Sequence, residues 1–141
     1  MDNPDPVAAV EAAMITIRRR QTRRTLAPQA GTPTQDVLDA IEAAAPTPLG
    51  VNAIATALGV DQPRASKLVA AAVKAGLIRR EADQADGRRT NLVLTPAGQA
   101  QLDAAHTHRR THFAAAMHDW TPTDQQTFAT LLTRFMTALD R

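Results

Sequence analysis

Residues 53–98 read AIATALGVDQPRASKLVAAAVKAGLIRREADQADGRRTNLVLTPAG, and the order of signals in this stretch decides the fold. The apolar residues before Gly59 and those after Asp61 recur at the spacing of an α-helix. Gly59 suits a tight turn, Asp61 is a good cap for the second helix, and Gly76 ends that helix. Two short helices joined by a glycine-containing turn indicate a helix-turn-helix motif, whose second helix enters the major groove of DNA.

The spacing of apolar residues changes after Gly76. Residues 77–80 and 91–94 have the pattern of short strands, and the polar stretch 83–89 between them contains Gly87. Two short strands around a polar tip with a glycine indicate a β-hairpin. Because a hairpin directly after a helix-turn-helix is a wing, the stretch predicts a winged helix-turn-helix.

The flanking sequence is also helical. The predicted helices run from about Pro6 to Thr25, through Val37, Leu38 and Ile41 to a point before Pro46, from Thr95 to about His118, and from Thr121 onward. The first and last helices carry more apolar surface than one small winged unit can bury, and a two-fold dimer would bury it. The predicted fold is therefore mainly α with a small β-hairpin wing: a winged helix-turn-helix of six helices that forms a homodimer through its terminal helices.

The distribution of charge indicates an anionic partner. The chain has 141 residues, a net charge of +2 and two lysines among its 16 basic residues, so the positive charge is almost entirely guanidinium. Residues 25–63 carry four acids and no base, whereas residues 64–90 carry seven bases and three acids. Arginine suits phosphates and base edges, and local clustering favours a local contact with nucleic acid. A second basic run at 18–24 fits either a contact with DNA phosphates or a solvated helix face.

The composition excludes several classes of function. The chain has no cysteine, which rules out disulfides, Cys-based metal sites, thiol nucleophiles and cysteine redox sensors. It has no Gly-rich phosphate loop and no recognisable catalytic spacing, so we expect neither an enzyme nor a cofactor. No apolar run approaches the roughly 20 residues of a membrane span, and no signal peptide is evident. We therefore expect a cytoplasmic protein without a membrane partner.

Residues 53–98 resemble the MarR (multiple antibiotic resistance regulator) family of winged helix-turn-helix transcription factors. The most diagnostic segments are GLI at 76–78, DGR at 86–88 and LTPAG at 94–98, and their order and spacing also fit. The resemblance implies one domain over 1–141, with dimerisation helices at 1–30 and 96–141 and a DNA-binding lobe at 34–95. It also implies a homodimer that binds double-stranded DNA at a roughly palindromic operator.

The resemblance assigns particular side chains to DNA. The recognition-helix residues are Gln62, Pro63, Arg64, Ser66 and Lys67, and the wing residues are Asp86, Arg88 and Arg89. In the family the wing arginine, here Arg88, reaches into the minor groove and the wing aspartate, here Asp86, braces it. A narrow groove concentrates negative potential and favours arginine, which supports this assignment. The alternative for each residue is an exposed polar side chain without a contact.

Several positions depart from the family pattern. Pro63 stands where a small polar group is common, so one possible donor to DNA is missing. Ala70 and Ala71 stand where charged residues are frequent, which reduces the phosphate contacts expected from that face. Gln35 replaces a common aromatic residue and argues against a phenolic effector held by aromatic stacking.

Family members often release DNA when an effector binds near the dimer helices. The candidates for an apolar effector pocket are Phe113, Met117 and Trp120, and a core at a helix junction is the alternative. His108 and His112, at i and i+4, could chelate zinc if Asp103 or the other subunit supplied a third ligand. Because Arg109 and Arg110 disfavour a cation there, we expect no metal, and the histidines 106–118 are otherwise pH-responsive, effector-contacting, interfacial or solvated.

These observations predict a sequence-specific DNA-binding transcriptional regulator. We expect a repressor that binds a pseudo-palindromic operator as a homodimer and is modulated by a small-molecule effector. One alternative is a winged-helix protein-interaction module that no longer binds DNA specifically. The other is a metal- or pH-responsive regulator that uses the His106–His118 histidines.

Overall fold

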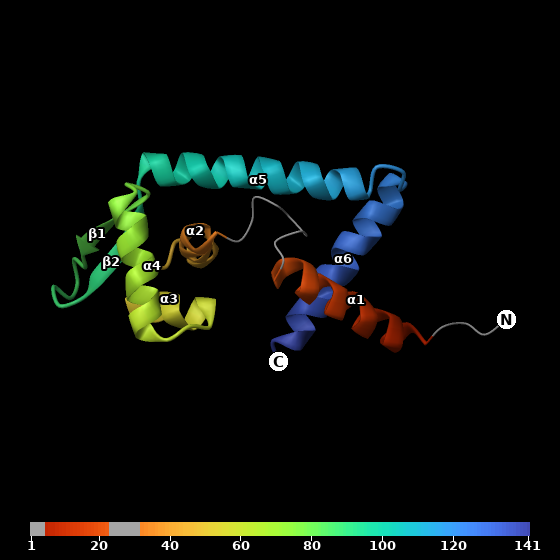
Figure 1. Cartoon of the computed structure of the whole chain (residues 1–141), viewed down its shortest axis with the longest axis horizontal. Coiled ribbons are helices and arrows are strands. Elements are labelled where there is room, and N and C mark those ends of the chain that lie inside the picture. Colours follow the sequence, from red (N-terminus) through yellow and green to blue (C-terminus); the bar gives the residue numbers. More distant parts are fainter. Residues whose placement is uncertain (1–4, 23–31) are drawn as a thin grey trace. The chain divides into compact units, whose positions relative to one another are not determined.

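The computed structural model describes residues 5–22 and 32–141. These residues form six helices and one hairpin, in the order α1 (Pro6–Thr22), α2 (Pro33–Ala44), α3 (Val51–Leu58), α4 (Gln62–Lys74), β1 (Ile78–Ala82), β2 (Thr90–Leu94), α5 (Pro96–Ala116) and α6 (Pro122–Leu139) (Figure 1). The chain divides into two compact units, one up to Arg109 and one from Arg110. The predicted winged helix-turn-helix architecture is confirmed.

Residues 23–25, predicted to finish the first helix, lie outside the described residues. The helix α5 ends at Ala116 and not near His118, because the amides that follow donate to carbonyls three residues back instead of four. The amide of Met117 donates to the carbonyl of Ala114 (3.1 Å), three residues back, and Trp120 donates to Met117 in the same way (3.0 Å).

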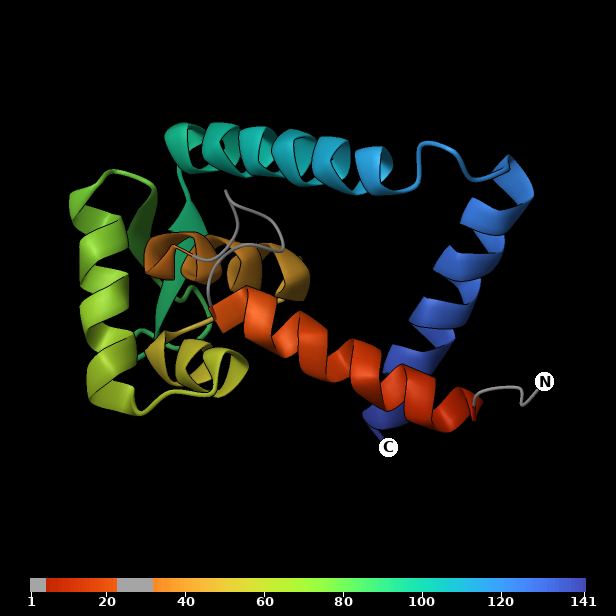
Figure 2. The same ribbon diagram turned by 45° about the vertical axis from the view of Figure 1, so that its right-hand side comes forward.

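The core of the first unit lies between α2, α3, α4, the hairpin and the start of α5. Figure 2 shows α3 and α4 meeting at a tight turn, with the hairpin beside α4. The buried apolar side chains come from every one of these elements: Val37, Leu38, Ile41, Ile54, Ala55, Ala65, Val69, Ala72, Ile78, Leu92 and Leu102. The apolar stripes predicted for α2, α3 and α4 therefore contribute to one common core.

The turn between α3 and α4 forms as its residues predict. Gly59 has a left-handed backbone with φ 67°, and its amide donates to the carbonyl of Thr56 (3.2 Å). The carboxylate of Asp61 accepts the amide of Arg64 at 2.8 Å and so caps α4. Gly76, with φ 76°, follows the end of α4 and lets the chain turn into β1.

The hairpin is anchored to the chain ahead of α3. The strands pair antiparallel from Ile78 with Leu94 to Ala82 with Thr90. The amide of Leu92 also donates to the carbonyl of Leu49 (2.8 Å), which adds a bridge from the segment before α3 to β2. The strand β2 is therefore hydrogen-bonded on both edges, to β1 on one and to the segment before α3 on the other.

The LTPAG segment joins the end of α4, the wing and the start of α5. The hydroxyl of Thr95 donates to the carbonyl of Gly76 and accepts the amide of Gly98 (3.1 Å), while the Thr95 amide donates to Leu77 (3.1 Å). An ideal Cβ placed on Gly98 would lie 2.0 Å from the carbonyl oxygen of Leu77. The first turn of α5 can lie against this backbone only because residue 98 has no side chain.

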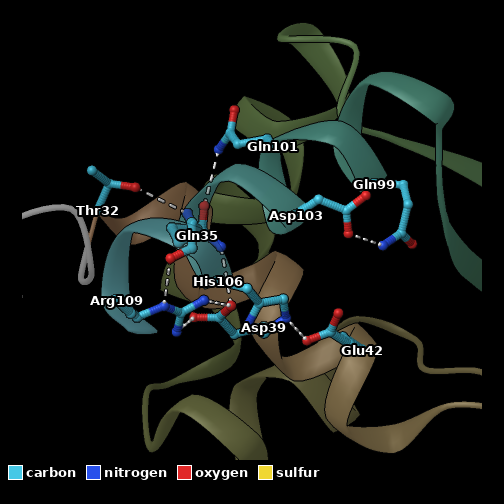
Figure 3. A network of polar contacts seen from close by, with 10 residues as sticks. Thr32, Gln35, Asp39, Glu42, Gln99, Gln101, Asp103, His106 and Arg109 are labelled. Atoms are coloured by element: carbon cyan, nitrogen blue, oxygen red, sulfur yellow. Dashed lines mark hydrogen bonds and ion pairs between the residues drawn. The ribbon is translucent and has the colours of Figure 1, made fainter. Parts of the chain in front are cut away.

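A polar network ties α2 to α5 within the first unit (Figure 3). Gln35 is 3% exposed, and its side chain donates to Asp39 (3.0 Å) and accepts from Gln101 (3.2 Å). The guanidinium of Arg109 donates to both carboxylate oxygens of Asp39, at 3.2 and 3.3 Å. Because the buried amide has both partners, its desolvation is compensated.

One more contact in this network involves His106, whose Nε2 lies 2.6 Å from a carboxylate oxygen of Glu42. Both side chains are roughly one-third exposed, so water screens this pair more than it would a buried one. The network as a whole fixes the rotation of α5 about its axis relative to α2.

The unit from Arg110 onward contains the end of α5 and all of α6. The hydroxyl of Thr121 accepts the amide of Asp124 (3.1 Å), which confirms the predicted cap of the last helix. Trp120 packs edge-to-face against Phe128 with ring centroids 5.4 Å apart. The helix α6 has no buried residue, and its apolar side chains are exposed: Phe128, Leu131, Leu132, Met136 and Leu139. Within residues 5–22 and 32–141, no helix combines the length and apolar composition needed to cross a membrane.

Gly98→Ala is expected to destabilise the protein, although alanine is the better helix former by about 1 kcal/mol. The added methyl meets backbone that cannot rotate away, so we expect a loss of roughly 1–3 kcal/mol in the free energy of unfolding, measured by urea denaturation. Gly87→Ala is the matched control, since no atom lies within 4 Å of its Cβ position. Equal stability of both variants would contradict the close approach.

Candidate nucleic-acid interface

The polar face of α4 is turned to solvent. Gln62, Pro63, Arg64 and Lys67 are exposed and Ser66 is partly exposed, whereas Ala65 and Val69 are buried in the core. The burial of the apolar stripe orients these side chains outward from a rigid helix. The recognition-helix candidates therefore form one accessible surface.

The wing loop 83–89 is held by its own polar groups. The amide of Asp83 donates to the carbonyl of Arg89 (3.0 Å), and the amide of Arg89 donates to the carbonyl of Asp86 (2.9 Å). The carboxylate of Asp86 accepts the backbone amide of Arg88 at 3.1 Å. In the described part of the chain this carboxylate forms no ion pair with a guanidinium, so its contact with Arg88 runs through the backbone.

Asp83 organises the same loop and was not among the residues singled out from the sequence. One of its carboxylate oxygens accepts the amides of Ala85 (2.8 Å) and Asp86 (3.2 Å), and the other accepts the side-chain amide of Asn91 (3.4 Å). The amides of Ala85 and Asp86 hold the pKa of Asp83 below its ordinary value of 3.8. An aspartate that bonds the amide two residues later is a recognised turn former, and this signal could have identified it.

A polar cavity of about 590 Å³ lies between the base of the wing and the start of α3. Its polar lining comes from three separate stretches: Gly50 and Asn52 at the start of α3, Gln62 at the start of α4, and Arg88, Arg89 and Asn91 in the wing. The predicted recognition-helix and wing residues Gln62, Arg88 and Arg89 are thus brought together around one cavity. Asn52 and Asn91 are additional members that the sequence pattern did not mark.

The charge of this surface is uneven. Of the basic residues in β1, Arg79 is paired with Glu81 at 3.0 Å, and both side chains are about half exposed. Such an exposed pair contributes little to stability, but it neutralises part of the strand's charge. Arg64, Lys67, Arg88 and Arg89 form no ion pair among the described residues, so their charge faces solvent.

The effector candidates lie in the second unit. Phe113 contacts the ring of His112 (centroids 5.9 Å apart), and the carbonyl of Met117 accepts from the side chain of Gln125 (3.2 Å). Phe113 and Trp120 are each about two-fifths exposed. Trp120 packs on Phe128, and the side chains of Phe113, Met117 and Trp120 line neither the cavity at the base of the wing nor a second cavity between the start of α2 and α5.

The histidine candidates do not form a metal cluster. His108 and His112 both lie on α5, one turn apart, and His106 is engaged with Glu42. Across the described residues, no group of three His, Asp or Glu side chains is arranged to hold a metal ion. The proposed third ligand, Asp103, instead accepts a hydrogen bond from Gln99 (3.0 Å).

The helix-turn-helix, the wing and the exposed basic side chains define a winged helix-turn-helix protein. The family model described as MarR family matches residues 34–89, and no curated protein matches the chain. Residues 34–89 are thus similar in sequence to the MarR family, and the chain as a whole has the fold of a MarR family protein. The resemblance inferred from the GLI, DGR and LTPAG segments is confirmed.

Three solved structures illustrate this similarity. A MarR family protein from Bacillus stearothermophilus is 15% identical, with full coverage of both chains and a TM-score of 0.82. A probable transcriptional regulator from Pseudomonas aeruginosa is 28% identical, over 89% of this chain and 98% of that one, with a TM-score of 0.60. A mutant of MepR from S. aureus bound to an oligodeoxyribonucleotide is 22% identical, over 94% and 97% of the two chains, with a TM-score of 0.61.

Asp83→Ala is expected to loosen the wing loop, so the amides of Ala85 and Asp86 should exchange with solvent faster. Because the carboxylate pKa is lowered on folding, its contribution is present above pH 3.8 and is lost as the pH falls through the lower, folded-state value. NMR of the wild-type Asp83 carboxyl carbon should give a titration midpoint below 3.8. Gln84→Ala is the control and should leave both amides protected. Unchanged exchange in Asp83→Ala would contradict the role of this carboxylate.

Proposed function

We propose that this protein is a MarR-family transcriptional regulator, a repressor that binds a pseudo-palindromic operator in double-stranded DNA as a homodimer. The observation that carries the proposal is the accessible surface of α4 together with the wing, where four basic side chains form no ion pair with any of the described acidic residues. An interaction module would not need to keep such a surface. The MepR mutant bound to an oligodeoxyribonucleotide supports the same conclusion by analogy.

In this proposal α4 enters the major groove. Gln62 and Arg64 are suited to bidentate contacts with adenine and guanine edges, and Ser66 and Lys67 to bases or phosphates. Pro63 can contact DNA only through its shape, because proline has no hydrogen-bond donor. Arg88 enters the minor groove, where negative potential favours a guanidinium, and Arg89 contacts the backbone beside it. Asp86 positions Arg88 through the backbone amide that it accepts.

The dimer in this proposal forms through the terminal helices, residues 1–30 and 96–141, and leaves 34–95 as the DNA-binding lobe. The exposed apolar residues of α6 and of α1, where Val7 is 75% exposed, provide the surface that the partner would cover. Apolar surface of this extent on a small domain is typical of an interface. A two-fold dimer presents two recognition helices, which explains why a palindrome is the expected target.

We further propose that the protein acts in the cytoplasm by binding rather than catalysis, and that a small molecule modulates it. A cavity of about 410 Å³ between the start of α2 and α5 is of the size used by small ligands. Thr32, Gln101 and His108 line it and offer hydrogen bonds. The metal- or pH-responsive alternative, which uses the histidines 106–118, would appear as an effect of zinc or pH on DNA affinity.

Selection of bound duplexes from a random pool tests the proposed function. We expect one palindromic consensus, bound far more tightly than random DNA, with the logarithm of affinity falling linearly with the logarithm of salt concentration. Arg64→Ala should weaken the consensus by about 1–3 kcal/mol and relax the preference at one position, and Arg88→Ala should also weaken binding. The affinities are measured by fluorescence anisotropy.

Arg110→Ala removes the same charge from the exposed side of α5 and serves as the control, with little expected effect. Weak binding of every duplex, without a consensus, would overturn the proposal and favour the interaction module. An affinity of Arg88→Ala equal to that of the wild type would reject the wing assignment alone.

Leu131→Glu tests the dimer. Leu131 is 46% exposed on α6, and a carboxylate there would be buried without a partner in a dimer. Sedimentation should give the wild type at twice the 15.1 kDa chain mass and the variant closer to one chain. Gln126→Glu adds the same charge on the opposite side of α6 and should remain dimeric. A monomeric wild type would contradict the proposal.

A further inference from the structure

The cavity at the base of the wing has the charge of an anion site. Two guanidinium groups, Arg88 and Arg89, line it together with the amide side chains of Asn52, Gln62 and Asn91, and none of its lining residues is acidic. The nearby carboxylates of Asp61, Asp83 and Asp86 each accept backbone amides of their own segments and do not line the cavity. A ligand in this space therefore meets hydrogen-bond donors and positive charge.

The walls of the cavity are held at fixed separation by backbone contacts. The amide of Leu92 donates to the carbonyl of Leu49 at 2.8 Å, which joins the two walls next to the cavity. A Cβ on Gly50 would lie 3.2 Å from the carbonyl oxygen of Thr90, so the start of α3 and the wing strand are in close contact. The side chain of Asn91 is bonded to Asp83, and the carbonyl of Arg89 accepts the Asp83 amide. The cavity is thus formed before any ligand arrives.

We propose that this wing-base pocket binds one phosphodiester group of the DNA backbone, held by Arg89 from the wing and Asn52 from α3. The inference rests on the proposed DNA-binding function and deepens it, because it assigns a contact that carries no sequence information. A phosphodiester is a compact monoanion with several acceptor oxygens, and guanidinium groups bind such anions through charge-assisted hydrogen bonds.

The position of the pocket gives this contact a consequence for recognition. Gln62 lines the pocket and also begins α4, two residues before Arg64. A phosphate seated beside Gln62 therefore fixes how far α4 can advance along the groove. Contacts to the backbone set the register of a protein on its duplex, while contacts to base edges read the sequence. The pocket would set the register that lets Arg64 reach its base.

The test compares a specific duplex with a random-sequence duplex of equal length over a series of KCl concentrations. The variants are Arg89→Gln and Asn52→Asp, and a carboxylate in the first turn of α3 is compatible with folding because it favours the helix. We expect each variant to bind both duplexes about tenfold or more weakly than the wild type, by the same factor. The salt dependence of Arg89→Gln should decrease by about one unit of slope.

Thr107→Asp is the matched control for the added charge, since Thr107 is exposed on α5 and lines no part of the pocket. It should bind both duplexes more tightly than Asn52→Asp does. Wild-type affinity and slope in both pocket variants would overturn the phosphate site and leave the proposed function standing. Loss confined to the specific duplex would also overturn it, because the residues would then read bases. Failure of the wild type to bind either duplex would overturn both proposals.

A second measurement distinguishes backbone phosphate from a free anion. NMR titration with inorganic phosphate at constant ionic strength should shift the side-chain amide signals of Asn52 and Asn91 in the wild type and less in Arg89→Gln. If these signals shift while both pocket variants bind DNA like the wild type, the pocket serves a free anion and the proposal is wrong.

Discussion

The rest of the structure depends on the close approach of α5 to the backbone of Leu77. Here three segments meet: the end of α4, Leu77 just before β1, and the first turn of α5. The hydroxyl of Thr95 bonds to Gly76 and to Gly98, and Gly98, which has no side chain, lies against the backbone of Leu77. This junction therefore sets the orientation of both the exposed face of α4 and the wing. A side chain at residue 98 would push α5 away from the wing, and Leu102, which is buried one turn later, would leave the core.

The wing loop 83–89 is held in a different way, because none of its residues belongs to the hydrophobic core. It is closed by hydrogen bonds from Asp83 and Asp86 to backbone amides, which orient Arg88 and Arg89 without neutralising them through ion pairs. Exposed guanidinium groups on a preformed loop lose little conformational freedom on meeting an anion. The acidic residues of the wing thus stabilise the conformation of the loop, while its arginines remain available to bind an anion.

The polar network between α2 and α5 shows how the protein accommodates a glutamine where the family pattern has an aromatic residue. Gln35 stands where an aromatic residue is common, yet it is 3% exposed and both ends of its amide are bonded. Asp39 then joins this amide to Arg109, so polar contacts replace the apolar packing that an aromatic ring would provide. A fully satisfied polar network of this kind specifies one arrangement of its helices, since any other leaves a buried group unbonded.

The sequence by itself determined the order of helices, the turn at Gly59, the caps at Asp61 and Thr121 and the wing, because these depend on residues close together in the chain. It also marked Arg64 and Arg88 as solvent-facing, since they lie off the apolar stripe or on a polar loop. Only the tertiary structure decided that Gly98 must lack a side chain, that Gln35 is buried, and that Asn52 and Arg89 line one cavity. Each of these depends on atoms brought together from distant segments, and spacing along a chain carries no information about such contacts.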